Sequence, residues 1–104
     1  MIASLSGTVL TASIEGLVVE VGGVGLRVLT TPSTTTNVHV GQHVSLSTTL
    51  VVREDSLTLF GFLDSSDRDA FEVLQSVSGV VPRMALAALA MYPAAGLRGS
   101  VARG

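Results

Sequence analysis

The stretch VVREDSLTLFGF, residues 51–62, predicts a β-hairpin around which the rest of the chain is arranged. Apolar residues alternate on both sides of its centre, at Leu50 and Val52 before it and at Leu57 and Leu59 after it. Alternation with a period of two is typical of a strand that buries one face. The pattern therefore predicts two paired strands with these four side chains on the buried face.

The centre of this hairpin holds two adjacent carboxylates, Glu54 and Asp55. Asp and the following Ser56 suit a turn, because their short side chains can hydrogen-bond to nearby backbone. Charged residues at hairpin tips are most often simply solvated. A catalytic pair is less favoured still, because general acid–base chemistry needs two carboxylates that converge on one substrate in different environments. We therefore expect an outward-facing acidic tip with no catalytic role.

The sequence before this hairpin predicts further strands. Residues 4–9 alternate between polar and apolar or small types, and residues 16–29 do so on both sides of Gly22 and Gly23. Two consecutive glycines favour a tight hairpin turn, because both can adopt positive φ. Residues 30–37, which are rich in threonine and contain a proline, predict a loop or a short helical turn.

Five short strands in residues 1–63 favour a mainly β fold, a five-stranded OB-type barrel, with a small open sandwich as the alternative. The pattern changes at Asp64, and residues 64–104 predict a small helical segment. Asp64 and its neighbours supply helix N-cap residues. Pro82 suits the first turn of a second helix, which is apolar nearly all round and should be buried or lie at an interface. Residues 94–102 predict a weak third helix.

The amino-acid composition of the chain argues against several classes of function. The chain of 104 residues has a formal net charge of −2 and no lysine, which counts against a generic nucleic-acid binder. Cysteine is absent, so disulfides and thiolate metal sites are excluded. No basic leader segment is visible, and the longest apolar run, residues 84–92, is less than half of a membrane span. We expect a soluble, cytoplasmic protein.

A second informative stretch joins the two predicted helices, and it supplies a candidate anion-binding turn. A helix that follows a glycine turn points backbone N–H groups and a partial positive charge at a bound phosphate, and an arginine adds a full charge. On local sequence alone, an ordinary helical connection explains this stretch more often. Such a turn would bind the phosphates of a nucleic-acid backbone without reading its sequence. The candidate DNA-binding residues are therefore Ser78, Gly79, Val80, Val81, Pro82 and Arg83.

Other motifs predict no chemistry. His39 and His43 have a spacing that could chelate a metal on a helix, but Gly41 and the strand after it favour two surface histidines. The glycine-rich residues 21–25 lack the spacing of a phosphate loop and predict a turn. No nucleophile–base set is present, so we expect no enzyme activity, no metal and no cofactor.

The combination and order of these motifs resembles bacterial RuvA, the Holliday-junction-binding subunit of the branch-migration machinery. The resemblance runs from residue 1 to about residue 92, and the acidic hairpin and the glycine turn are its most specific parts. The matching segments are Met1-Ile2 with Gly7, residues 19–25, residues 51–55, residues 58–62, Arg68 with Phe71, residues 77–80 and residues 82–86.

The resemblance implies an OB-type barrel followed by helix-hairpin-helix elements that grip duplex DNA. It implies a homotetramer in which Glu54 and Asp55 form an acidic pin near the junction crossover, while residues 78–83 match the first helix-hairpin-helix. It also implies a non-catalytic partner of the RuvB motor ATPase in recombination and repair. Because the sequence ends at Gly104, we expect the second helix-hairpin-helix and the RuvB-docking domain to be missing.

Two residues depart from the family pattern, and the first is Leu26, which stands where the family usually has an aromatic residue. Val81 stands where the family has glycine, and a β-branched residue resists positive φ and blocks close approach of the backbone. This predicts weakened phosphate binding at the turn. The alternative function is therefore an OB-fold oligomerisation or protein-binding module that has lost its affinity for DNA.

Overall fold

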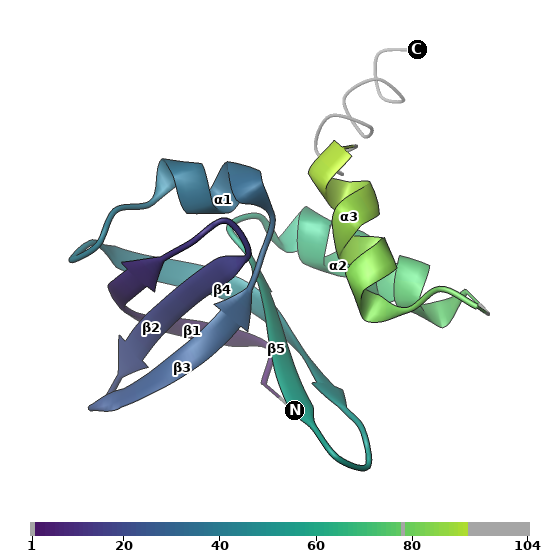
Figure 1. Cartoon of the computed structure of the whole chain (residues 1–104), viewed down its shortest axis with the longest axis horizontal. Coiled ribbons are helices and arrows are strands. Elements are labelled where there is room, and N and C mark those ends of the chain that lie inside the picture. The colour runs from purple at the N-terminus through teal and green to yellow at the C-terminus, as the bar shows by residue number, and fades with distance from the viewer. Residues whose placement is uncertain (1, 78, 92–104) are drawn as a thin grey trace.

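A computed structural model describes residues 2–77 and 79–91 of the chain. These residues form a closed five-stranded barrel followed by a helical pair that packs against one side of it (Figure 1). In chain order the elements are β1 (Ser4–Ala12), β2 (Gly16–Val21), β3 (Val24–Leu29), α1 (Pro32–Asn37), β4 (His43–Val52), β5 (Leu57–Phe62), α2 (Ser65–Ser76) and α3 (Pro82–Met91).

The barrel has the strand order β1-β2-β3-β5-β4 and closes where β4 pairs with β1. All neighbouring strands are antiparallel except β3 and β5, which pair in parallel at Val28↔Leu59 and Leu29↔Phe60. This arrangement confirms the predicted five-stranded OB-type barrel rather than an open sandwich. The predicted hairpin over residues 16–29 is also confirmed, with both of its turn glycines at positive φ.

The first strand is longer than its alternation predicts. The sequence pattern ends at Val9, but β1 continues to Ala12. Its register against β2 shifts between Val9 and Thr11, which marks a β-bulge. A bulge inserts one residue and moves the following side chains to the opposite face, so a strict period of two cannot detect the rest of the strand.

Strand β5 is buried on both faces over its second half. Leu59 belongs to the core inside the barrel, whereas Phe60 and Phe62 belong to a second core between the barrel wall and the helices. The rings of Phe60 and Phe71 of α2 lie 4.8 Å apart, centroid to centroid. A Cβ atom at Gly61 would lie 2.5 Å from a methyl group of Val28, so this position has no room for a side chain.

The two helices begin where the capping residues predict. Asp64 is the N-cap of α2, and its carboxylate accepts the backbone N–H of Ser66 over 2.8 Å. In α3, Ala85 and Leu89 are buried, but Met84 and Met91 are exposed, so the helix is covered along one face only. The predicted third helix, residues 94–102, lies outside the described residues. No helix in the described ranges is long and apolar enough to cross a membrane.

Candidate functional site

The tip of the β4–β5 hairpin holds Glu54 and Asp55 on a short closed turn. The two strands stay paired up to the residues that flank this turn. The backbone N–H of Arg53 then donates to the Ser56 carbonyl over 2.9 Å. Both carboxylates are exposed, and neither forms an ion pair with any described residue. The predicted hairpin over residues 51–62 is confirmed, and its tip points away from the barrel (Figure 1).

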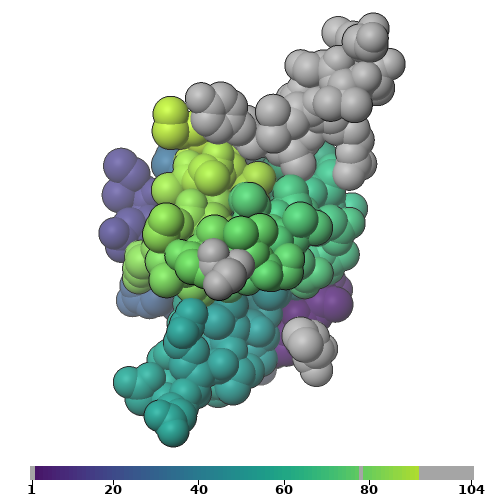
Figure 2. Space-filling model, turned by 90° about the vertical axis from the view of Figure 1, so that its right-hand side faces the viewer, coloured from purple at the N-terminus to yellow at the C-terminus, as the bar shows by residue number. Residues whose placement is uncertain are grey.

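The hairpin is longer than the barrel wall from which it emerges. β4 pairs with β1 only as far as Ser47, and β5 pairs with β3 only at Leu59 and Phe60. Beyond these positions the two strands pair only with each other, and Figure 2 shows their end as a protrusion below the helices. Val52 and Leu57 are consequently 66% and 70% exposed. The prediction that both are buried was wrong, because alternation indicates a face but not whether anything covers it.

The helical elbow, residues 79–83, leads into and begins α3. Gly79 adopts a left-handed backbone with φ of 85°, and nothing lies near the space that a Cβ atom would occupy. The backbone N–H of Val80 donates to the Val77 carbonyl over 3.2 Å. Pro82 is the first residue of α3, as predicted. Ser78, one of the predicted site residues, lies outside the described residues.

Val81 is not strained in this elbow. Among the described residues, only glycines have positive φ, so Val81 does not adopt the backbone that a β-branched residue resists; the weakened phosphate binding stays a prediction. The left-handed position is Gly79, two residues earlier. The Val81 carbonyl accepts the N–H groups of Met84 and Ala85 at the start of α3. Its side chain is 50% exposed, so what it changes at this surface is shape rather than backbone conformation.

The structure places the arginine of the elbow beside the strand that leads to the acidic tip. Arg83 of α3, Arg27 of β3, Glu15 and residues 57–59 of β5 line one hollow of about 240 Å³, which we call the basic hollow. Arg27 and Arg83 are both exposed. The elbow and the hairpin, which are separate motifs in the sequence, therefore meet at one surface.

Sequence reasoning did not single out Arg27. The sequence feature that could have identified it is its position between Leu26 and Val28 in a predicted strand, because this position puts its side chain on the outer face. It is also one of only six basic residues in the chain. What the sequence could not show is that β3 and α3 lie next to the same part of β5.

The remaining predicted motifs show no further site. His39 and His43 are both exposed. Residues 21–25 contain the turn between β2 and β3. In the part of the chain that the structure describes, no three His, Cys, Asp or Glu side chains are grouped so as to hold a metal ion.

Comparison with known proteins gives consistent matches. Residues 1–61 match the family model for the RuvA N-terminal domain. The chain is 54% identical over 103 residues to the Holliday junction branch migration complex subunit RuvA of Beutenbergia cavernae, which covers 99% of this chain and 52% of that protein. It is 51% identical over 104 residues to the protein of the same name from Streptomyces coelicolor, covering 100% of this chain and 52% of that one.

A third relative, from Thermobifida fusca, has the same name and is 51% identical over 102 residues, or 98% of this chain and 50% of that protein. The chain thus spans about half the length of the curated relatives that it matches. The similarity includes the helical segment, because it extends well beyond residue 61.

Proposed function

This chain belongs to the RuvA family, and we propose that it binds four-way (Holliday) DNA junctions as the non-catalytic subunit of an ATP-driven branch-migration complex. The names of its relatives support a role in branch migration. In this proposal the chain acts in DNA recombination and repair in the bacterial cytoplasm. The RuvB motor ATPase of the family supplies the energy, and this chain supplies recognition of DNA structure.

The projecting hairpin is the observation that carries this proposal. Glu54 and Asp55 are exposed at the end of two strands whose other half is fixed in the barrel. Carboxylates repel DNA phosphates by about 1 kcal/mol per pair at 4 Å in water, and by more where water is partly excluded. A rigid acidic tip is therefore disfavoured inside a continuous duplex. It is tolerated at a crossover, where strands separate around it.

The helical elbow supports the proposal from a second side. We propose residues 1–63 as the barrel domain and residues 64–104 as a helical segment with one helix-hairpin-helix. The backbone N–H of Arg83, at the start of α3, and the Arg83 guanidinium would hold the backbone of one duplex arm. Such contacts position DNA without reading its sequence. The proposed DNA-binding residues are Ser78 to Arg83.

A binding comparison tests the proposed function. An immobile four-way junction and a linear duplex of the same sequence are titrated with the chain at several salt concentrations. We expect the junction to bind more tightly, and both affinities to fall as salt rises, because phosphate contacts release counterions. Equal affinity for the two DNAs, or no binding of either at low salt, would rule out structure-selective binding by this chain.

An apolar surface next to the hairpin favours a second candidate function, an oligomerisation or protein-binding module. A groove of about 330 Å³ runs beside the hairpin, and its lining is mostly apolar. Its apolar lining residues are Ile2, Leu26, Leu50, Leu57 and Leu59. The first proposal also includes a homotetramer, in which four acidic tips meet at the crossover.

Two measurements separate these candidates. Sedimentation velocity across a range of concentrations tests for the tetramer. A chain that stays monomeric at every concentration would contradict a tetramer in which four acidic tips meet. The variant Val81→Gly tests the elbow. If the valine side chain hinders a phosphate, the variant binds the junction more tightly. If neither the chain nor this variant binds DNA but the chain assembles, the second candidate is favoured.

A further inference from the structure

The basic hollow combines charges from two parts of the fold that are far apart in sequence. Arg27 comes from the barrel strand β3, and Arg83 comes from the first turn of α3. Neither guanidinium forms a hydrogen bond or an ion pair with any described residue. By contrast, Arg68 donates to the Ala3 carbonyl over 3.0 Å and pairs with Asp69 over 2.9 Å. The two arginines of the hollow are thus free to bind an external anion.

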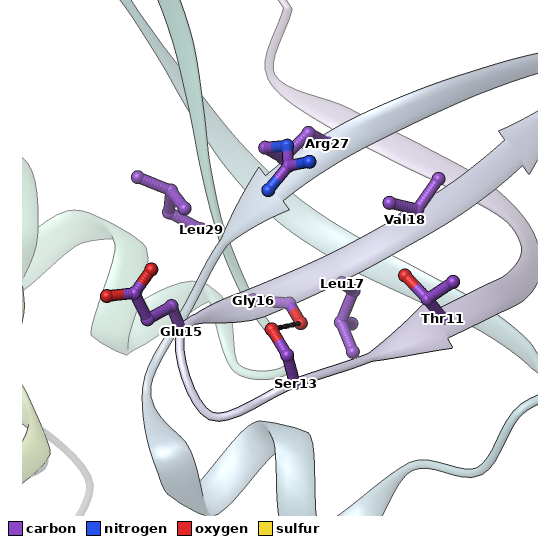
Figure 3. A pocket seen from close by; sticks show the side chains of 8 residues that line it. All are labelled: Thr11, Ser13, Glu15, Gly16, Leu17, Val18, Arg27 and Leu29. Atoms are coloured by element: carbon purple, nitrogen blue, oxygen red, sulfur yellow. Dashed lines mark hydrogen bonds between the residues drawn. The ribbon is translucent and has the colours of Figure 1, made fainter.

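The surroundings of these arginines suit a phosphate. Thr58 lies in the wall between the apolar residues Leu57 and Leu59. Glu15 also lines the hollow, but it makes no ion pair with either arginine. In Figure 3, Glu15 precedes β2 and Arg27 lies on β3, and no hydrogen bond joins the two side chains. Guanidinium groups match phosphate oxygens with paired donors, so two arginines around one hollow favour a doubly contacted phosphate.

We propose that Arg27 and Arg83 together hold one phosphodiester group of the DNA backbone, and that Arg27 is thereby a DNA-binding residue of the barrel itself. This inference rests on the proposed junction binding. The bound phosphate would lie against β5, on the strand that continues to the acidic tip. A DNA strand would then be attracted at the base of the hairpin and repelled at its end. Glu15 would weaken this attraction.

The test measures binding of the 104-residue chain to an immobile four-way junction, for Arg27→Gln, Arg83→Gln and the double variant. We expect each single substitution to weaken binding roughly five- to tenfold, and Arg27→Lys to keep most of the affinity. A phosphate contact contributes about one unit to the slope of log affinity against log salt. If both arginines hold one phosphate, the double variant loses about one unit of slope, not two.

A pair of glutamate substitutions provides the matched control. Glu15→Gln and Glu20→Gln remove the same charge, but only Glu15 lines the hollow. We expect Glu15→Gln to tighten junction binding by about two- to threefold and Glu20→Gln to change it little, because only the first lies near the bound phosphate. Equal effects of the two substitutions would mean that net charge matters and the hollow does not.

The possible failures are distinguishable. If the unmodified chain binds the junction but Arg27→Gln binds equally well, the hollow is not a phosphate site and the proposed function stands. If the unmodified chain binds no junction at low salt, both proposals fall. A third measurement repeats the junction titration in the presence of inorganic phosphate at matched ionic strength. Competition by micromolar phosphate, without any effect of Arg27→Gln on junction binding, would assign the hollow to a small anion and overturn the inference.

Discussion

The two halves of the β4–β5 hairpin have one continuous register but different surroundings. In the half within the barrel, Leu59 is 9% exposed and Phe60 lies against the helices. In the projecting half, Leu57 is 70% exposed and Val52 is 66% exposed. The pairing of the backbone continues through both halves. Strand pairing therefore sets the shape of the hairpin, whereas burial decides which of its side chains stabilise the fold and which are available for binding.

The largest effect is expected from removing the aromatic side chain that joins the barrel half to the helices. Phe60→Ala should lower the free energy of unfolding by about 3–5 kcal/mol, because Phe60 is buried and packs against Phe71. Urea denaturation followed by circular dichroism measures this loss. A loss of less than about 1 kcal/mol would mean that the helices contribute little to the stability of the barrel.

A matched pair of leucines on one strand tests the comparison directly. Leu59→Ala removes a buried side chain and should cost about 2–4 kcal/mol. Leu57→Ala makes the same change two residues nearer the tip, and should alter the free energy of unfolding by less than about 0.5 kcal/mol. Both values come from urea denaturation at low protein concentration. Equal losses would show that the projecting half is covered in solution, as in an assembled oligomer.

A smaller effect is expected where the chain leaves the barrel for α2. Asp64→Ala removes the N-cap carboxylate that accepts the N–H of Ser66, and should cost about 1 kcal/mol. Asp64→Ser, which keeps a capping oxygen, should retain most of the stability and serves as the control. Thermal denaturation compares the three proteins. If the two substitutions are equally destabilising, the cap is not what matters at this position.

The smallest effect on stability is expected at the tip. Glu54→Gln with Asp55→Asn should change the free energy of unfolding by less than about 0.5 kcal/mol, because both side chains are exposed. The same variant should reduce the preference for a junction over duplex, since the repulsion that disfavours a continuous duplex is gone. Parallel denaturation and DNA titration measure both quantities. Unchanged selectivity would remove the tip from the recognition mechanism.

Local sequence signals predicted the elements of this fold well. Alternation located the paired strands, the two glycines at positions 22 and 23 located their turn, and Asp64 and Pro82 located the starts of the helices. Each of these signals depends on interactions between residues that are close in sequence. Strand pairing and capping leave such signals because their geometry repeats or ends at fixed spacings.

The errors arose where the outcome depends on distant parts of the chain. Val52 and Leu57 continue an apolar pattern, but the barrel wall ends before it reaches them. The backbone conformation of Val81 also could not be read from the family pattern, because the left-handed position of this turn is Gly79; the weakened phosphate binding at Val81 stays a prediction. Arg27 was overlooked because only the folded barrel brings β3 beside α3.

The parallel contact between β3 and β5 is the shortest line of strand pairing in the barrel, with only two residue pairs. It is also the contact nearest to the point where the hairpin leaves the barrel. A sideways force on the tip would therefore act most strongly on this short β3–β5 pairing, at Leu59 and Phe60. Packing of Phe60 against the helices would then brace the barrel against that force.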